Sequence, residues 1–180
     1  MMFDDMGISL RIAREEDAVE IADLVNRAYR PLPQQAGWTH EADLIDGKRT
    51  SAAKVLSLFR DGSVILLLTH DDRIVSCVHV QRADSSAYIG MLATAPAMQG
   101  RDLGKRMLLH AEQYATECFG ASVIRMSVLS TRPELLAFYE RRGYTLTDEI
   151  GEYPLSLGVG RPKVDGIHVL SLIKFPATSS

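Results

Sequence analysis

The chain has 180 residues, of which 46% are apolar and 24% are charged, and its net charge at pH 7 is −3. This length allows one domain with a substantial core, and the composition is ordinary for a globular protein. The small negative charge, without a basic patch rich in aromatic residues, argues against a nucleic-acid-binding or membrane-surface role. The longest aliphatic run covers residues 64–68, too short to cross a membrane, and the acidic N-terminus lacks the apolar core of a signal peptide. We therefore expect a single domain over residues 1–180 and a cytoplasmic location.

The first third of the chain predicts one strand and then helices. Residues 8–14 alternate as a strand does, and residues 15–30 carry apolar side chains at helical spacing before Pro31 ends the pattern. Two shorter helices are predicted next, one capped by Thr39 and ending at Gly47, the other capped by Ser51 and ending before Gly62.

Strand signals cluster in the middle of the chain. Residues 64–70 and 73–82 read as a hairpin joined by Asp71 and Asp72, and residues 86–94 form a third strand that ends before Pro96. A helix is predicted from about residue 103 to 119. Its buried stripe consists of Leu103, Met107, Ala111, Tyr114 and Cys118.

The last third predicts a strand, a helix and two final strands. A strand at 122–129 precedes a capping box in which Thr131 caps the helix and Glu134 lies three residues on, with Gly143 ending that helix. Strands near 144–150 and 166–174 flank a loop rich in glycine and proline. This order predicts a mixed α/β domain of the α+β kind, with one mostly antiparallel sheet of about six to seven strands flanked by helices and at least one parallel crossover.

Several kinds of chemistry receive no support from the sequence. Cys77 and Cys118 are the only cysteines and both lie in apolar patterns, which favours buried reduced thiols over a disulfide. The five histidines have no metal-ligand spacing, so we expect no metal site. A G-x-S-x-G nucleophile elbow is absent from the sequence.

Residues 98–108, MQGRDLGKRML, lie where a predicted strand turns into a predicted helix. The first N–H groups of a helix lack internal partners and the dipole is positive there, so this place suits an anion. The stretch is neither G-x-G-x-x-G nor a Walker motif, and its spacing is Gln99-x-x-Asp102-x-Gly104. Judged by its own letters, the stretch fits a plain strand-to-helix turn better than a phosphate site.

Two further segments have a structural and a functional interpretation. Tyr139 in AFYERRGY is either a core tyrosine or a phenol that can protonate a leaving thiolate. Trp38, Glu41 and Asp43 in GWTHEADLIDG form either a solvated acidic helix face or the wall of a pocket for a cationic amine.

Three segments together resemble the GNAT superfamily of acetyl-CoA-dependent N-acetyltransferases. LRIAREEDAVEIADLVNRAY is similar to the family's first strand and helix, and YIGMLATAPAMQGRDLGKRMLLHAE to its strand, pyrophosphate loop and following helix. ELLAFYERRGY is similar to the tyrosine-bearing helix before a closing strand. The order and spacing of the three carry more weight than the short loop motif [QR]-x-x-G-x-[GA], and the resemblance covers nearly the whole chain.

The resemblance implies a role for each matching residue. Tyr139 would protonate the coenzyme A thiolate after an amine attacks the acetyl thioester directly. Backbone groups of the strand would hold the pantetheine and N–H groups of the loop the pyrophosphate. The cofactor-binding residues implied are Leu92, Ala93, Thr94, Gln99, Gly100, Arg101, Asp102, Leu103, Gly104 and Lys105.

The sequence departs from the family pattern at three positions. Asp102 stands at the usual first loop glycine, Arg132 at a frequent asparagine, and Tyr88 where some members place a glutamate base. Aspartate tolerates the left-handed backbone that glycine would adopt, but its charge opposes a phosphate unless the carboxylate turns back to cap the helix. We expect Asp102 to weaken coenzyme A binding without abolishing it. Deprotonation of the amine is left to a water chain, Glu41 or Asp43.

The sequence thus predicts an acetyl-CoA-dependent N-acetyltransferase without a metal, acting on a small cationic amine or a peptide amine. Trp38, Glu41 and Asp43 are the candidate acceptor-site residues. A non-catalytic acyl-CoA-binding sensor or regulatory module is the alternative, motivated by Asp102 and Tyr88. A homodimer is compatible with the resemblance, and nucleic-acid and membrane partners are not expected.

Overall fold

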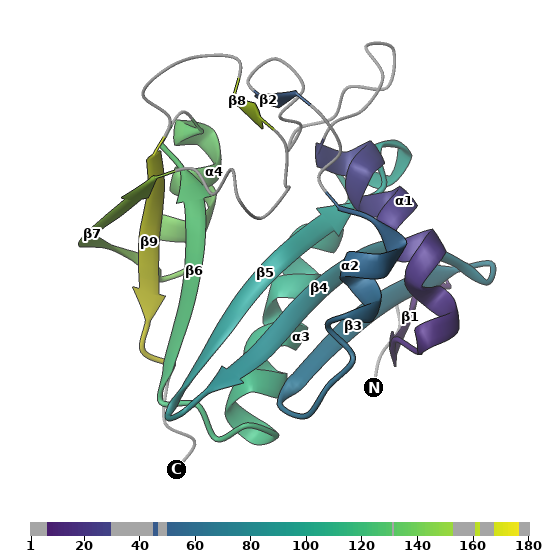
Figure 1. Cartoon of the computed structure of the whole chain (residues 1–180), viewed down its shortest axis with the longest axis horizontal. Coiled ribbons are helices and arrows are strands. Elements are labelled where there is room, and N and C mark those ends of the chain that lie inside the picture. The colour runs from purple at the N-terminus through teal and green to yellow at the C-terminus, as the bar shows by residue number, and fades with distance from the viewer. Residues whose placement is uncertain are drawn as a thin grey trace.

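The computed structural model describes residues 7–29, 45–46, 50–130, 132–152, 161–162 and 168–176. A seven-stranded sheet runs through it in the order β1-β3-β4-β5-β6-β9-β7, and only the β5–β6 pair is parallel. Helices α1 and α2 lie on one face of the sheet, and α3 and α4 on the other (Figure 1). The strands are β1 (Ser9–Ile12), β3 (Ser63–His70), β4 (Arg73–Ala83), β5 (Ser86–Thr94), β6 (Val123–Leu129), β7 (Thr145–Glu152) and β9 (His168–Lys174). This confirms the predicted mixed, mostly antiparallel fold.

The helices occupy the predicted stretches with shorter bounds. They are α1 (Ala18–Tyr29), α2 (Ala52–Leu56), α3 (Leu103–Glu117) and α4 (Pro133–Glu140), with short 3-10 turns η1 (Glu15–Asp17) and η3 (Pro96–Met98). Ser51 caps α2 as predicted, because its side chain accepts a hydrogen bond from the Lys54 N–H. Among the described residues, no helix is long and apolar enough to cross a membrane.

Two apolar clusters, one on each face of the sheet, form the core. The face under α1 and α2 includes Ile21, Val25, Leu67 and Cys77, while the other face packs α3 against β3–β6. The α3 stripe is only partly as predicted, since Leu108 and Ala115 are buried in it and Tyr114 is half-buried. Cys118 is exposed, contrary to the prediction, because α3 ends at Glu117 and Cys118 follows as its C-cap.

Some predicted element boundaries are wrong. Two of them are set by main-chain pairing between segments far apart in the sequence. Ile45–Asp46 is strand β2, paired with β8 (Arg161–Pro162), where a helix and a loop were predicted. Strand β7 continues through Glu152 into the predicted loop.

Helix α4 begins at Pro133 with Arg132 as its N-cap, since proline suits the first helical position. Thr39 and Thr131, the predicted caps, lie outside the described residues.

The parallel pair β5–β6 is short, and the two strands diverge beyond it. Residues 86–88 pair with residues 123–125, and no further β5–β6 pair is formed among the described residues. On its other side β5 has a bulge, where the register to β4 shifts and Met91 has a φ of 53°. The sheet therefore opens between the C-terminal half of β5 and the β6–β9–β7 half, as Figure 1 shows.

A buried polar cluster joins the two halves of the sheet. The Tyr144 hydroxyl donates to Glu112 Oε2 at 2.7 Å, and Lys174 Nζ lies 3.2 Å from both Glu112 oxygens. Burial and the Glu112 carboxylate raise the pKa of Tyr144. The cluster ties α3 to the start of β7 and to β9 from behind the sheet.

His79 on β4 predicts a pH-dependent stability. Burial, helped by Arg60, lowers its pKa from 6.5 to about 4, and a ring nitrogen lies 2.7 Å from Ser63 Oγ. The unfolded chain takes up a proton below pH 6.5, whereas the folded protein resists it down to about pH 4, so stability falls as the pH drops through this window.

We expect this histidine to cost up to about 3 kcal/mol of unfolding free energy between pH 6.5 and pH 4. Urea unfolding of wild type and His79→Gln at pH 7, 5 and 4 measures it. The difference in unfolding free energy between the two proteins should shift in favour of the variant as the pH falls. A difference that stays the same at all three pH values would contradict the prediction.

Candidate active site

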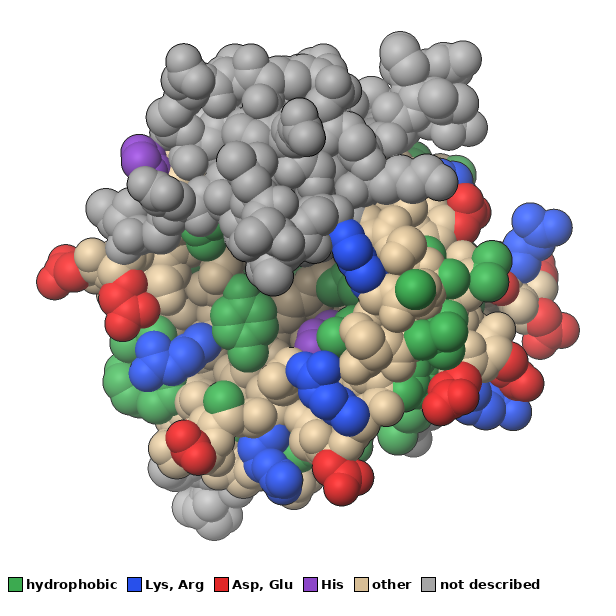
Figure 2. All heavy atoms as spheres, in the orientation of Figure 1, with side chains coloured by type: hydrophobic (Ala, Val, Ile, Leu, Met, Phe, Trp, Pro, Cys, Tyr) green, Lys and Arg blue, Asp and Glu red, His purple; other side chains and the backbone are tan. Residues whose placement is uncertain are grey.

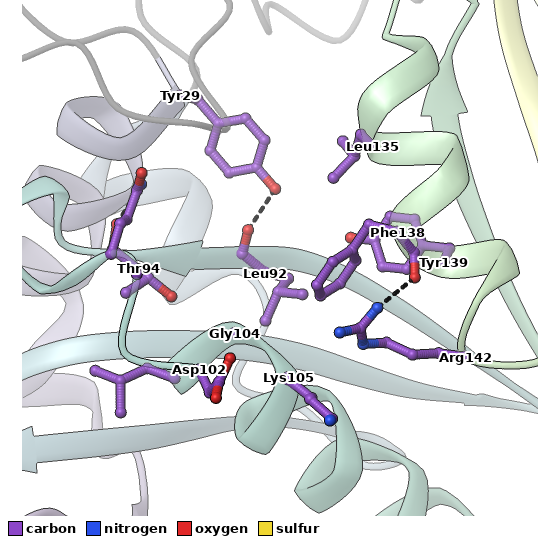
Figure 3. Close-up of a pocket in the computed structure, with 13 residues that line it drawn as sticks. Tyr29, Leu92, Thr94, Asp102, Gly104, Lys105, Leu135, Phe138, Tyr139 and Arg142 are labelled. Atoms are coloured by element: carbon purple, nitrogen blue, oxygen red, sulfur yellow. Dashed lines mark hydrogen bonds between the residues drawn. The ribbon is translucent and has the colours of Figure 1, made fainter.

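A cavity of about 430 Å³ lies where β5 parts from β6. Its walls come from the end of α1, the second half of β5, the start of α3 and the inner side of α4 with the turn after it (Figure 3). The lining residues are Tyr29, Leu92, Thr94, Gln99, Gly100, Asp102, Leu103, Gly104, Lys105, Leu135, Phe138, Tyr139 and Arg142. The cavity is thus apolar along the strand and α4, and polar at the start of α3.

The loop between β5 and α3 is shaped for an anion. Gln99 Nε2 donates to the Thr94 carbonyl at 3.2 Å, and Gly100 and Asp102 have φ values of 84° and 60°. The first helical hydrogen bond of α3 runs from the Arg106 N–H to the Asp102 carbonyl. The N–H groups of residues 103–105 therefore lack an acceptor within the helix and lie at its positive end.

The structure decides the conformation of Asp102. Its backbone is left-handed, as expected for a residue at the position of a loop glycine, and it is the N-cap of α3. Its side chain makes no capping hydrogen bond and lines the cavity. The alternative in which the side chain caps the helix is therefore wrong.

Most of the predicted cofactor residues come together at this cavity. The eight that line it are Leu92, Thr94, Gln99, Gly100, Asp102, Leu103, Gly104 and Lys105. The Ala93 side chain instead belongs to the core under α1, because alternation along β5 turns it to the opposite face. Arg101 is exposed outside the cavity lining. Trp38, Glu41 and Asp43 lie outside the described residues.

Tyr139 lies in the wall that faces β5. Its side chain is 7% exposed and makes edge-to-face contacts with Phe138 and Tyr144. Burial raises its pKa, while the positive charges of Arg132 and Arg142 oppose that shift. Within the described part of the chain its hydroxyl has no hydrogen-bond partner, so the hydroxyl proton can be donated to a ligand in the cavity.

Four lining residues were not predicted to belong to the site. Leu135 and Phe138 share the apolar face of α4 with Tyr139, which was the signal for them. Tyr29 was assigned only to the helix core, yet its hydroxyl donates to the Leu92 carbonyl at 2.6 Å. Arg142 lies beyond the helix, and no local pattern indicates it.

Arg132 and Tyr88, the two other departures from the family pattern, make contacts outside the cavity. Arg132 is 4% exposed, and its Nε lies 2.6 Å from Glu134 Oε1. Tyr88 is 40% exposed and donates to Ser127 Oγ at 2.7 Å across the β5–β6 pair. Neither residue lines the cavity.

The described surface on the face that carries α1 and α2 has charges of both signs. Figure 2 shows Lys and Arg side chains interspersed with Asp and Glu over the described part of the face that carries α1 and α2. Among the described residues, no group of three His, Cys, Asp or Glu side chains could hold a metal ion.

Comparison with known proteins identifies the family. A model described as the Acetyltransferase (GNAT) family matches residues 18–144.

The chain belongs to the GNAT family of acetyltransferases.

No curated protein matches the sequence.

Solved structures agree with the GNAT fold. The ribosomal-protein-S18-alanine N-acetyltransferase from Escherichia coli is 15% identical, with a TM-score of 0.72 and 96% of each chain covered. PaiA N-acetyltransferase from Thermoplasma acidophilum, in complex with coenzyme A, is 18% identical, with a TM-score of 0.71 over 95% of this chain and 100% of that one. YncA from Salmonella typhimurium, solved with its cofactor acetyl-CoA, is 15% identical, with a TM-score of 0.68 over 97% and 96%. At these identities the likeness shows the fold.

Gly104 in this GNAT loop offers a substitution that separates folding from binding. It lines the cavity in the first turn of α3, and an added Cβ would meet only Thr94 Oγ1, at 3.8 Å. Alanine at this helical position is favoured over glycine by up to about 1 kcal/mol.

We therefore expect Gly104→Ala to keep or raise the melting temperature while weakening coenzyme A binding about tenfold, roughly the effect of a lost hydrogen bond. Gly100→Ala in the same loop is the contrasting substitution for stability. Its φ of 84° penalises alanine, so stability falls although nothing lies within 4 Å of the new Cβ. Calorimetry and thermal melts measure both quantities, and unchanged affinity in Gly104→Ala would contradict the assignment of the loop.

Proposed function

We propose that this protein transfers an acetyl group from acetyl-CoA to a primary amine by direct attack within a ternary complex. The observation that carries the proposal is one continuous cavity whose lining includes both the start of α3 and the Tyr139 side chain, with β5 between them. Membership of the GNAT family supports acetyl-CoA as the donor, and two structural neighbours were solved with coenzyme A or acetyl-CoA.

The residues present fit coenzyme A. The N–H groups at the start of α3 suit its pyrophosphate, because they are unpaired within the helix and lie at its positive end. Leu92, Leu135 and Phe138 give an apolar wall for the pantetheine arm. The Leu92 and Thr94 carbonyls already accept hydrogen bonds from Tyr29 and Gln99, so further contacts there share those acceptors.

Tyr139 is the proposed general acid. The amine nitrogen bonds to the acetyl carbonyl carbon, the carbon–sulfur bond breaks, and the sulfur keeps the electron pair. Tyr139 gives its proton to that sulfur, while the attacking nitrogen loses its proton to water or to a base outside the described residues. The transfer moves the negative charge from the sulfur to the Tyr139 oxygen, where burial opposes it and the positive charges of Arg132 and Arg142 favour it. A proton from solvent then restores the phenol.

The proposed acceptor is a small cationic amine or a peptide amine. The proposal rests on Trp38, Glu41 and Asp43, which combine an aromatic face with carboxylates in one short segment. Glu41 or Asp43 remains the proposed base where water does not serve.

An acetylation assay over a panel of amines, with detection of the released thiol, tests the function. Polyamines, amino-acid amides and short peptides with a free N-terminus form the panel. We expect at least one of these classes to release coenzyme A well above the rate of hydrolysis. Tight acetyl-CoA binding with only slow hydrolysis across the panel would contradict the transferase proposal and favour an acyl-CoA sensor.

A further inference from the structure

Two opposite charges line the cofactor cavity from different elements. Asp102 lies at the start of α3, and Arg142 lies in the turn that follows α4, on the Tyr139 side of the cavity (Figure 3). An acid in a phosphate loop is unfavourable by itself. The arginine on the facing wall changes that balance.

The Arg142 guanidinium is held in place by α4. Its Nη1 donates to the Phe138 carbonyl at 2.7 Å, and its central carbon lies 3.7 Å from the centroid of the Phe138 ring. These two contacts fix the plane of the guanidinium at the cavity wall, as stacking and a directed donor do together.

The same guanidinium keeps unused donors. Its Nε is buried and has no hydrogen-bond partner among the described residues. A guanidinium has five N–H donors, and the Phe138 carbonyl is the one hydrogen-bond acceptor of the Arg142 side chain in the described part of the chain. Because Arg142 lines the cavity, the guanidinium donors that Phe138 does not engage can bind an anionic ligand group there.

Arg142 also lies within electrostatic range of the loop. Burial, followed by the charge of Arg141, lowers its pKa, whereas the Asp102 carboxylate acts in the opposite direction. A charge that interacts with Asp102 also interacts with an anion bound at the start of α3, because Asp102 is the N-cap of that helix.

We propose that Arg142 binds the pyrophosphate of coenzyme A from the α4 side and offsets the charge of Asp102. The loop N–H groups and Arg142 then hold the anion between two walls, joining α3 to the helix that carries Tyr139. This inference rests on the proposed use of acetyl-CoA as donor.

Titration calorimetry on Arg142→Gln tests the proposal with three ligands: coenzyme A, dephospho-coenzyme A and pantetheine. We expect Kd to rise about tenfold or more for both pyrophosphate-bearing ligands and to change less than about twofold for pantetheine. Arg141→Gln, the exposed neighbour, is the matched control and should leave all three affinities unchanged. Arg142→Lys keeps the charge without the planar donors and should recover part of the loss.

A second set of titrations uses a substitution of Asp102. Asp102→Asn should tighten both pyrophosphate-bearing ligands severalfold, with no effect on pantetheine. Equal losses for pantetheine and coenzyme A in Arg142→Gln would overturn the proposal, because the residue would then only shape the wall. A loss confined to coenzyme A would overturn it as well, since that result assigns Arg142 to the 3′-phosphate. Wild-type protein that binds no coenzyme A would refute the proposed function itself, whereas unchanged affinity in Arg142→Gln refutes this inference alone.

Discussion

Replacing Tyr139 with phenylalanine should lower kcat by about 100-fold or more while changing the Kd for coenzyme A less than about twofold. The hydroxyl is the only group removed, and it has no hydrogen-bond partner among the described residues, so no structural contact is lost with it. The ring keeps its edge-to-face contacts with Phe138 and Tyr144. Loss of rate without loss of binding is the signature of a group that acts on the reacting atoms.

Steady-state kinetics with the best amine of the panel, together with calorimetry, measure this effect. Tyr114→Phe is the matched control, because Tyr114 on α3 packs against Phe119 beyond the helix end and does not line the cavity. The raised pKa of Tyr139 adds a second expectation, that the wild-type rate shows no loss from ionisation of this tyrosine below about pH 10. An unchanged kcat in Tyr139→Phe would refute the assigned acid.

Removing the buried carboxylate of Glu112 should cost about 3 kcal/mol of unfolding free energy. The Glu112→Ala change leaves the Lys174 ammonium and the Tyr144 hydroxyl without their shared acceptor behind the sheet. Since the Lys174 side chain is 24% exposed, water compensates part of the loss, which places the estimate at the low end for a broken buried pair.

Urea unfolding monitored by circular dichroism measures this cost. Glu117→Ala on the same helix is exposed and should change stability by less than about 0.5 kcal/mol. Equal, small effects of the two substitutions would show that the cluster does not stabilise the junction between the two halves of the sheet. Activity per folded molecule should be unaffected, because Glu112 does not line the cavity.

Local patterns in the sequence predicted most of the strands and helices. Strands β3, β4 and β5 and helices α1 and α3 fall within a few residues of their predicted bounds, because apolar runs, alternation and helical spacing are local properties. The β2–β8 pair was not predicted, since it depends on main-chain contacts between segments more than 100 residues apart. Glu112 was missed for a related reason: its burial depends on Lys174, which the fold brings to it.

The candidate site could likewise be predicted from the sequence only in part. The loop and Tyr139 could be placed from three motifs in order, and the left-handed conformation of Asp102 could be expected from its position. The missing capping hydrogen bond could not be predicted, because aspartate is a residue type that often caps helices. Asp102 occupies the N-cap position, but with its left-handed backbone the side chain makes no capping hydrogen bond. Arg142 has no motif of its own, and it lines the cavity because the fold brings the turn after α4 to face β5 and the start of α3.

Titration of acetyl-CoA into the wild-type protein and into Gly104→Trp tests the identity of the cavity most directly. Gly104 lines the cavity at the start of α3, so a large side chain there occupies the proposed pyrophosphate position. We expect saturable one-to-one binding by the wild type and none by the variant, with both proteins folded by circular dichroism. Absence of binding to the wild type, or equal affinity in the two proteins, would contradict the assignment of this cavity to acetyl-CoA.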